Sequence, residues 1–339
     1  MLRTALIGFG GYGARLAREI VDDPNGRLSA VVDIDSGTLD RASKELDLDR
    51  SNLYTDERTM YEETALDAVV IATPPAFHDD QIHEAFDRGL NVLCEKPVVV
   101  RRPAAERLRD RVAESDLTFM AGYQRHLNPG FIRARERYQG DHVPSHVVGE
   151  LTQNWTAYFK QGTNWRTDPD IGGRGHLFSV GTHVVESVLW LTGLRPVAVS
   201  AEMEFHDDAN LIDKKSSMTV RFANGAVGTF ADSAVAPVTR EHIHVWDDDG
   251  AVYLDGEGWG RRALTVIDAT GGERQPDLPY DESPTKFGVF AESALADTEP
   301  PATADDVLAV TALLDAAYES APTGERVEID PVSYTSRHE

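Results

Sequence analysis

The chain contains very little cysteine and very little lysine. Cys94 is its single cysteine, and six lysines are found among 339 residues. One thiol cannot form an internal disulfide, which excludes a disulfide-stabilised scaffold, and its place after Asn91-Val92-Leu93 predicts a buried strand position. No apolar run is long enough to cross a bilayer, and the run Leu2–Phe9 leads into glycine without a basic leader. We therefore expect a cytoplasmic protein.

Basic residues are also scarce relative to acidic ones. Lysine and arginine total 33 against 57 aspartate and glutamate, which gives a net charge of −24. Such an excess repels polyanions, so we predict no nucleic-acid partner and no membrane partner. Abundant acid with few lysines is typical of halophilic proteins, in which salt screens the self-repulsion. An acidic surface without halophilic adaptation is the alternative, and stability in low salt separates the two.

The order of apolar segments predicts an α/β protein of two domains. Over residues 1–122, short β-type runs alternate with helical patterns, which predicts a Rossmann domain with a doubly wound parallel sheet. Over residues 123–339, β-rich segments succeed one another, and Asn224-Gly225 is a hairpin signal. This pattern predicts an open, mainly antiparallel sheet, with helices over 177–191 and 305–318. One face of such a sheet needs a cover, so we expect a homodimer or homotetramer.

The first predicted strand leads into a nucleotide-binding motif. Gly8-Phe9-Gly10-Gly11-Tyr12-Gly13 fits G-x-G-x-x-G at the start of a helix, where free amides bind a pyrophosphate. Asp33 ends the second strand, twenty positions after Gly13, where a carboxylate accepts hydrogen bonds from the adenosine ribose. The same carboxylate repels a 2′-phosphate, so we predict NAD as the cofactor. Arg41 lies close enough in sequence to leave NADP possible.

Two further loops follow predicted strands. Ala72-Thr73-Pro74-Pro75 closes one strand and Glu95-Lys96-Pro97 closes another. Ligands of open α/β sheets bind at the carboxyl ends of the strands, which places both loops beside the cofactor. The charge of Lys96 there favours an alkoxide over a neutral hydroxyl.

At this point the sequence resembles a known family. The glycine motif, Ala72-Thr73-Pro74, Glu95-Lys96-Pro97 and the later Gly181-Thr182-His183 are together similar to the Gfo/Idh/MocA oxidoreductases, over essentially the whole chain. The resemblance implies that the first domain binds NAD(P) and that a sugar or cyclitol binds between the two domains. It also implies that Lys96 contacts the reacting hydroxyl and that His183 is the acid/base residue.

The chain departs from the family pattern at one position. Ser179 stands where the family has an aspartate, one helical turn before His183. A carboxylate orients an imidazole and stabilises its protonated form, whereas a serine hydroxyl only forms a hydrogen bond. Glu186 and Asp170 are the carboxylates that could replace the aspartate, and we interpret His176 as structural or substrate-lining.

The candidate site residues fall into three groups. Lys96 and His183 are predicted to be catalytic. The cofactor is predicted to contact Gly8, Phe9, Gly10, Gly11, Tyr12, Gly13, Asp33, Ile34, Thr73, Pro74, His78, Glu95 and Lys96. The substrate is predicted to contact Tyr123, Arg125, Trp165, Ser179 and His183. His242 and His244 share one face of a strand, but the sequence offers no third ligand at metal spacing, so we predict no metal site.

These residues predict a dehydrogenase. We expect hydride transfer between a sugar or cyclitol hydroxyl and the nicotinamide, with His183 taking the hydroxyl proton and Lys96 polarising the oxygen. The reverse reduction is equally open. Two other functions remain as alternatives, a glycoside-processing enzyme with tightly bound NAD and a catalytically impaired sugar or NAD sensor, the second because of Ser179.

Overall fold

A computed structural model describes residues 1–161, 164–207, 209 and 211–331. The chain forms two compact units. The first comprises Met1–Val99, Glu106–Gln124 and Pro284–Ala304; the second comprises Val100–Ala105, Arg125–Ser283 and the residues from Asp305 onward. The sequence predicted one boundary, between residues 122 and 123. It did not predict that Pro284–Ala304 belongs to the first unit.

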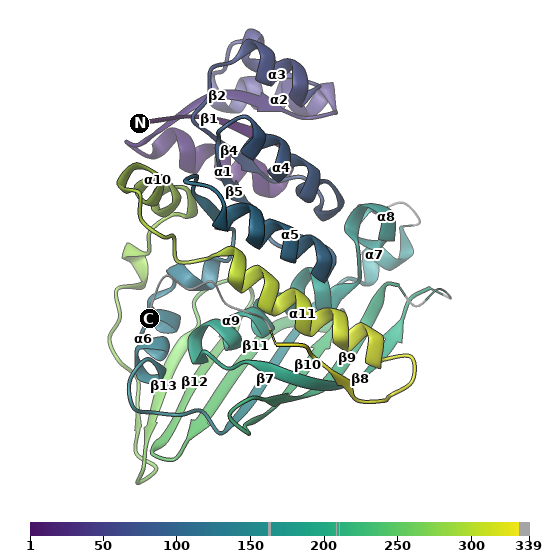
Figure 1. Cartoon of the computed structure of the whole chain (residues 1–339), viewed down its shortest axis with the longest axis vertical. Helices are drawn as coiled ribbons and strands as arrows, with labels where there is room; N and C mark the ends of the chain where they lie inside the picture. The colour runs from purple at the N-terminus through teal and green to yellow at the C-terminus, as the bar shows by residue number, and fades with distance from the viewer. Residues whose placement is uncertain (162–163, 208, 210, 332–339) are drawn as a thin grey trace. The chain divides into compact units, whose positions relative to one another are not determined.

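The first unit contains a six-stranded sheet with the order β3-β2-β1-β4-β5-β6, all of whose strand pairs are parallel (Figure 1). The predicted Rossmann sheet is confirmed. All four residues of β4 are buried, as expected for a strand covered on both faces. The strands are β1 (Leu2–Ile7), β2 (Gly26–Val32), β3 (Leu53–Tyr54), β4 (Ala68–Ile71), β5 (Asn91–Cys94) and β6 (Phe119–Ala121). The helices are α1 (Gly11–Asp22), α2 (Ser36–Leu46), α3 (Glu57–Glu63), α4 (His78–Asp87), α10 (Lys286–Ala296) and most of α5 (Arg102–Ala113), whose residues up to Ala105 are grouped with the second unit.

The second unit contains a nine-stranded sheet with the order β14-β13-β12-β11-β7-β10-β9-β8-β15. Its pairs are antiparallel except for β7 with β10, which confirms the open, mainly antiparallel sheet. The strands are β7 (His146–Asn154), β8 (Pro196–Phe205), β9 (Asp213–Phe222), β10 (Val227–Ser233), β11 (Val235–Asp247), β12 (Gly250–Glu257), β13 (Ala263–Asp268), β14 (Glu273–Arg274) and β15 (Val327–Glu328). The helices are α6 (Pro129–Tyr138), α7 (Thr156–Lys160), α8 (Pro169–Gly172), α9 (Thr182–Thr192) and α11 (Ala304–Ser320).

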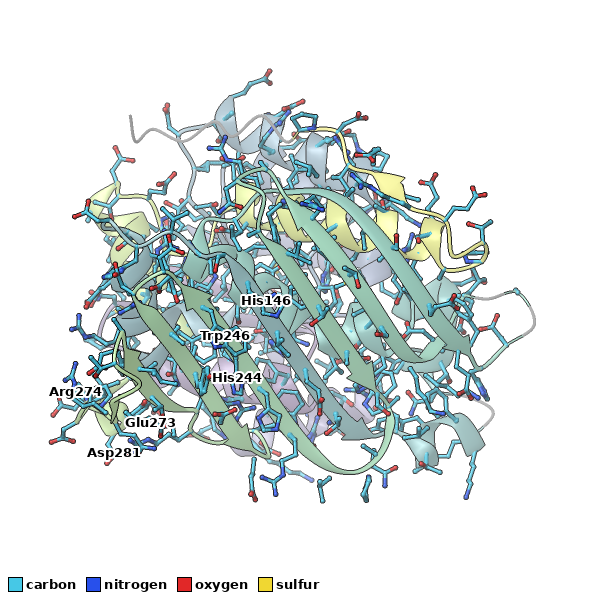
Figure 2. All side chains as sticks on the ribbon, turned by 90° about the horizontal axis from the view of Figure 1, so that it is seen from below. His146, His244, Trp246, Glu273, Arg274 and Asp281 are labelled. Carbon is cyan, nitrogen blue, oxygen red and sulfur yellow. The ribbon has the colours of Figure 1, made fainter. Side chains whose placement is uncertain are left out.

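The two faces of this sheet have different neighbours. On one face, α9 packs against β7 and β11, and a Cβ added to Gly149 of β7 would lie 2.6 Å from Val184 of α9. Along β11, Ile243 and Val245 are buried while the alternate residues are half-exposed. The opposite face carries His146, His244 and Trp246 and is seen from its open side in Figure 2. The alternation places apolar residues toward α9 and polar or aromatic residues on the open face.

The helix predicted over 177–191 is present and unbroken, but it is not α-helical throughout. A π-helical turn spans Leu177–Gly181, and α9 begins only at Thr182. This turn passes closely over two buried aspartates, since a Cβ added to Gly175 would lie 2.1 Å from the backbone nitrogen of Asp213 and one added to Gly181 would lie 2.8 Å from Asp232 Oδ1. The close passage leaves no space for a side chain at either position. π-helical turns are rare and occur frequently at functional sites.

Several elements were absent from the sequence prediction, among them α6, β13 and α10. Helix α10 is capped by Thr285, whose hydroxyl accepts a hydrogen bond from the amide of Gly288 at 3.0 Å. Within the described part of the chain, every helix is too short or too polar to span a bilayer. The Asn224-Gly225 hairpin is confirmed, because β9 and β10 pair across it and Gly225 adopts a positive φ of 89°.

Candidate active site

The glycine motif forms a tight turn between β1 and α1. Gly8 has a φ of +94°, and a Cβ there would lie 2.8 Å from the carbonyl oxygen of Ala72. A Cβ at Gly13 would lie 2.0 Å from the carbonyl oxygen of Gly8. By contrast, a Cβ at Gly10 or Gly11 would meet nothing within 4 Å. Two glycines therefore permit packing, and the other two leave the backbone open to a ligand.

Helix α1 begins directly behind this turn without a side-chain cap. Gly10 is its N-cap residue and forms no side-chain hydrogen bond, and the first turn contains no acidic residue. The first amides of the helix are therefore available to an anion, and the helix dipole favours negative charge there. This open glycine backbone fits the pyrophosphate of a dinucleotide.

Backbone amides of the glycine turn and of the following loop fix the carboxylate of Asp33. Its Oδ2 accepts a hydrogen bond from the amide of Phe9 at 2.8 Å, and its Oδ1 accepts one from the amide of Asp35 at 3.0 Å. Arg41 donates to the carbonyl oxygen of Phe9 at 2.6 Å. Ile34, the next residue after Asp33, is 93% exposed. An exposed aliphatic side chain beside an oriented carboxylate suits an adenosine, and the contacts of Ile34 and Asp33 with the cofactor stay predictions.

The loops after β4 and β5 are joined by a buried histidine. Nδ1 of His78 lies 2.9 Å from the carbonyl oxygen of Pro97, and its Nε2 lies 2.8 Å from that of Thr73. Burial lowers the pKa of His78. A neutral imidazole has one N–H, so His78 donates to one of these two carbonyl oxygens and lies against the other, between the Thr73-Pro74 and Lys96-Pro97 loops. His78 has this positioning role in the structure, and its contact with a cofactor stays a prediction.

A buried lysine lies beside the same loop. Nζ of Lys286, in α10, is 2.5 Å from Oε1 of Glu95 and 4.6 Å from the ring centroid of Tyr12. Burial opposes the charge of Lys286, but the carboxylate of Glu95 outweighs it, and the pKa of Lys286 lies above its usual value. Glu95 is thus fixed immediately before Lys96, whose side chain is half-buried. Lys286 was not predicted as a site residue, although the scarcity of lysine in this chain made each of the six a candidate.

In the second unit, His183 lies in the first turn of α9. Its side chain is buried, and its ring centroid lies 5.5 Å from that of Trp259, which is 45% exposed. Ser179 lies in the preceding π-helical turn and is half-buried. A buried imidazole beside an exposed aromatic side chain suits a polyol, because carbohydrate rings pack on aromatic faces while a nearby base takes a hydroxyl proton. Trp259 was not predicted.

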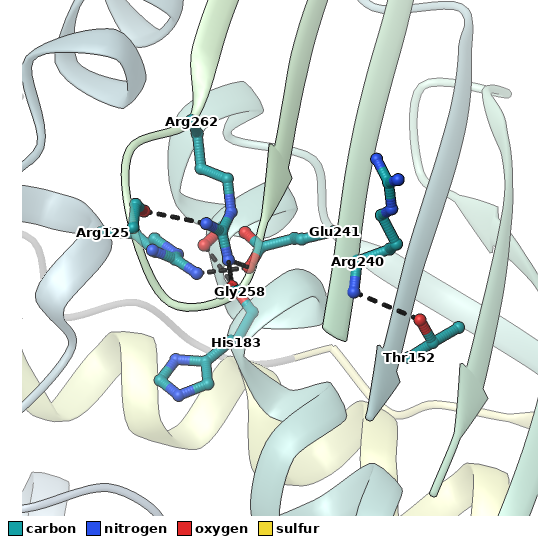
Figure 3. A network of polar contacts seen from close by, with 9 residues as sticks. Arg125, Thr152, His183, Arg240, Glu241, Gly258 and Arg262 are labelled. Carbon is teal, nitrogen blue, oxygen red and sulfur yellow. Dashed lines mark hydrogen bonds and ion pairs between the residues drawn. The ribbon is translucent and has the colours of Figure 1, made fainter. Parts of the chain in front are cut away.

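Figure 3 shows a buried charge network near His183. Glu241 of β11 accepts hydrogen bonds from the guanidinium groups of Arg125 and Arg262, and the Arg262 contact is 2.7 Å. Arg262 also donates to the carbonyl oxygen of Gly258 at 3.0 Å, which fixes the loop that carries Trp259. Arg125 therefore has a structural function. Its predicted contact with substrate remains a prediction.

The remaining candidate residues differ in burial and in their neighbours. Glu186 is buried and paired with His126, whose ring stacks on Trp190 at a centroid distance of 4.0 Å. Asp170 is exposed in the first turn of α8. Tyr123 is buried and is assigned to the first unit, whereas Trp165 is 37% exposed and lies beneath the guanidinium of Arg166 at 4.3 Å. Their contacts with a substrate stay predictions.

His176 belongs to a second buried acid cluster. Its Nδ1 lies 2.7 Å from Oδ2 of Asp232, and its ring packs edge-on against Trp155. Asp213 accepts hydrogen bonds from the amide of Leu177 at 2.9 Å and from the hydroxyl of Tyr318. Burial, together with the charge of Asp232, raises the pKa of Asp213 to about 6. The cluster anchors the π-helical turn, which supports the structural interpretation of His176.

Comparison with known proteins agrees with this geometry. Residues 2–123 match the model of the "Oxidoreductase family, NAD-binding Rossmann fold", and residues 143–253 match that of the "GFO/IDH/MocA C-terminal domain". Together these ranges include more than half of the chain. It belongs to the Gfo/Idh/MocA oxidoreductase family. The resemblance inferred from the sequence is confirmed, as is an NAD(P)-binding Rossmann domain.

Relatives of this Gfo/Idh/MocA protein match it over nearly its full length. A D-xylose 1-dehydrogenase [NADP(+)] of Haloarcula marismortui is 27% identical and covers 97% of this chain and 93% of its own. A D-xylose 1-dehydrogenase (NADP(+)) of Haloferax volcanii is 25% identical, with 96% and 99% covered. An oxidoreductase domain protein from Kribbella flavida has the same fold, with a TM-score of 0.86, 23% identity, and 97% and 99% covered.

Proposed function

We propose that this chain is an NAD(P)-dependent dehydrogenase acting on a hydroxyl of a sugar or cyclitol. The observation that carries the proposal is the nucleotide cradle of the first unit, an open glycine backbone with Asp33 oriented beside it. Membership of the oxidoreductase family supports it, and the two D-xylose dehydrogenases make an aldose the first substrate to test.

Different residues bind the cofactor and act on the reacting hydroxyl. The glycine turn and the first amides of α1 bind the pyrophosphate, and Asp33 binds the ribose. Bound nicotinamide supplies the hydride acceptor or donor. His183 takes the proton of the reacting hydroxyl, and Lys96 stabilises the negative charge that develops on its oxygen. Lys286 holds Glu95 and thereby orients the Glu95-Lys96-Pro97 loop.

The activity is tested by absorbance of the reduced cofactor with D-xylose, other aldoses and inositols. We expect His183→Ala to lower kcat/KM by roughly 10²–10⁴-fold, as loss of a proton-transfer group does, and Lys96→Ala to lower it by roughly 10²–10³-fold, as loss of an oxyanion-stabilising group does. The matched controls are Lys160→Ala and His142→Ala, which replace residues at the surface of the second unit. Full turnover in either site variant would remove that residue's role.

Two outcomes lead to the alternative functions. NAD that copurifies and survives dialysis, with conversion of a glycoside but no net NADH, would indicate a glycoside-processing enzyme. Sugar binding without turnover of any substrate would indicate a sensor, and Ser179 at the usual aspartate position favours testing for this. Restoring the carboxylate with Ser179→Asp should raise turnover if its absence limits the His183 proton transfer.

We propose NAD as the preferred cofactor, with NADP as the alternative. Asp33 repels a 2′-phosphate, and the nearby Arg41 is already bonded to the Phe9 carbonyl oxygen. Both D-xylose relatives carry NADP(+) in their names, so the ratio of kcat/KM for the two cofactors decides the point. Asp33→Ser should move that ratio toward NADP by about tenfold or more, which corresponds to about 1.4 kcal/mol.

We further propose a cytoplasmic homo-oligomer adapted to high salt. The net charge of −24 and the two relatives from halophilic archaea support the adaptation, and the open sheet face supports self-association. Sedimentation and thermal unfolding across a salt series test both statements. A stable fold without salt would contradict halophily, and a monomer at all salt concentrations would contradict self-association.

A further inference from the structure

Three side chains of metal-ligand type meet on the open face of the nine-stranded sheet. They are His242 and His244 of β11 and Asp255 of β12. Nδ1 of His242 lies 2.6 Å from Oδ1 of Asp255, and Nε2 of His244 lies 2.9 Å from the same oxygen. One ligand atom from each residue lies within 4.8 Å of the other two. All three side chains are half-buried in the single chain, so an ion reaches them there before a second copy covers this face.

The sheet register explains this convergence. His242 stands directly opposite Asp255 in the antiparallel pair of β11 and β12. His244 is two residues further along β11 and therefore points to the same face. On the other side of β11, Glu150 of β7 stands opposite His242, at a spacing where side chains interact. Asp255 of the neighbouring strand β12 thus provides the third ligand, which the spacing of residues in the sequence did not reveal.

Aromatic residues fix one of the two imidazole rings. The ring of His244 stacks on that of Tyr253 at a centroid distance of 3.9 Å and meets Trp246 edge-on at 5.8 Å. Figure 2 shows His244 and Trp246 together on the open face. A ring held on two sides loses less freedom when it binds a ligand, which favours binding.

This place is separate from the candidate catalytic histidine. Ile243 and Val245, which alternate with the two histidines, are fully buried on the face against which α9 packs. His183 lies in α9, so the sheet itself stands between the two places. An ion bound at His242, His244 and Asp255 acts on the sheet and its open face, not on the reacting hydroxyl.

We propose that His242, His244 and Asp255 bind one divalent transition-metal ion, of the class of Zn²⁺, Ni²⁺ or Co²⁺. Two imidazoles and one carboxylate suit these ions, whereas Mg²⁺ and Ca²⁺ prefer oxygen ligands alone. In the bound form, Nδ1 of His242 and Nε2 of His244 present their lone pairs to the ion, and each ring carries its hydrogen on the other nitrogen.

Binding requires a small rearrangement. With ligand bonds of about 2.0–2.1 Å, donor atoms around a tetrahedral ion stand roughly 3.3 Å apart, so Oδ1 of Asp255 moves about 0.7 Å away from Nδ1 of His242 and about 0.4 Å away from Nε2 of His244. Three protein ligands leave a coordination position for water, so the ion exchanges with solvent.

Binding is tested on the full chain without an added histidine tag, after dialysis against a chelator. Isothermal titration with ZnCl₂ should give one saturable ion per chain. Loss of one ligand should weaken binding by more than the roughly 10–100-fold that loss of an outer hydrogen-bond partner costs, so we expect His244→Ala and Asp255→Asn to abolish it. His142→Ala is the matched control, since His142 also lies within 4 Å of two carboxylates, of Asp247 and Asp249, but has no second histidine.

A second readout uses the tryptophan at the site. NiCl₂ should quench the fluorescence of Trp246 because the ion binds next to His244, and Trp246→Phe should remove the quenching while leaving zinc stoichiometry at one. Far-ultraviolet circular dichroism shows whether each variant is folded. Absence of saturable zinc binding by the folded protein, or equal affinity in folded Asp255→Asn, would overturn the proposal. Loss of turnover on chelation would overturn the separation from the catalytic place.

Discussion

The two compact units hold their candidate site residues by different means. In the first unit the binding groups are mostly backbone, exposed by Gly10 and Gly11 and braced by Gly8 and Gly13. In the second unit the important side chains are buried ions, such as Glu241 between Arg125 and Arg262. A backbone cradle is built from residues adjacent in sequence, whereas this ion network joins Arg125 to Glu241 across 116 positions. The first kind of site tolerates little change in shape, and the second little change in charge.

The sharpest test of the backbone cradle compares two of its glycines. Gly13→Ala should prevent the first unit from folding, at a cost above about 5 kcal/mol, because its Cβ would lie 2.0 Å from a backbone oxygen that cannot move aside. Gly10→Ala enters open space, so unfolding should change by less than about 0.5 kcal/mol while NAD binding weakens. Denaturant unfolding and cofactor titration measure the two effects. Similar stabilities for both variants would refute this division of roles.

The ion network of the second unit is tested at its shared carboxylate. Glu241→Gln should lower the free energy of unfolding by about 3–5 kcal/mol, because it leaves the buried guanidinium groups of Arg125 and Arg262 without their counter-charge. The control is Glu328→Gln, which removes a surface ion pair with Arg326 and should cost about 0–1 kcal/mol. Equal costs in urea unfolding would show that burial of the network adds nothing.

The first unit also contains one buried ion pair, between Lys286 and Glu95, so it does not depend on backbone groups alone. Lys286→Met should cost toward the lower end of about 3–5 kcal/mol, since it leaves Glu95 buried without its partner. The double variant Lys286→Met with Glu95→Gln should recover part of this loss. If Lys286 also positions the loop, kcat/KM of the double variant stays low although its stability recovers. Full activity in the double variant would leave Lys286 a purely structural residue.

The smallest expected effect is a change in pH dependence at Asp213. Its pKa is raised to about 6, so the folded chain binds a proton more tightly than the unfolded chain, and stability falls as pH rises from about 4 to about 6. Asp213→Asn should flatten this slope. Above pH 6 it should also remove the cost of burying a charged carboxylate, which lowers the free energy of unfolding by on the order of 1–3 kcal/mol. Urea unfolding at a series of pH values measures it. An unchanged slope would assign the titration to another group.

The first unit was largely predictable from its residues. Its sheet alternates apolar strands with helices, and the glycine motif specifies both a turn and a ligand, since few residue types tolerate the φ of Gly8. Asp33 follows at a fixed spacing because one helix and one strand have a typical combined length. The pairing of Glu95 with Lys286 was out of reach, because 191 positions separate them and no periodic pattern links the two.

The second unit was predictable in its architecture but not in its contacts. Alternating apolar residues indicated β11 and its neighbours, and Asn224-Gly225 indicated a hairpin. The π-helical turn before His183 was missed, and the tight passage of Gly175 and Gly181 over buried aspartates is a tertiary effect that residue patterns do not reveal. For the same reason the meeting of His242 with Asp255 depends on strand register, which a single sequence leaves open.

The late return of Pro284–Ala304 to the first unit affects the order in which the protein is made. A ribosome that has released residues 1–124 has delivered all six strands of the parallel sheet, yet α10 is still unsynthesised. Until Lys286 emerges, the carboxylate of Glu95 lacks its cation and Phe287 and Phe290 have not joined the apolar core. The nucleotide-binding unit therefore completes its fold only after residues 125–283 of the second unit have been made, and a chain cut after residue 283 lacks α10.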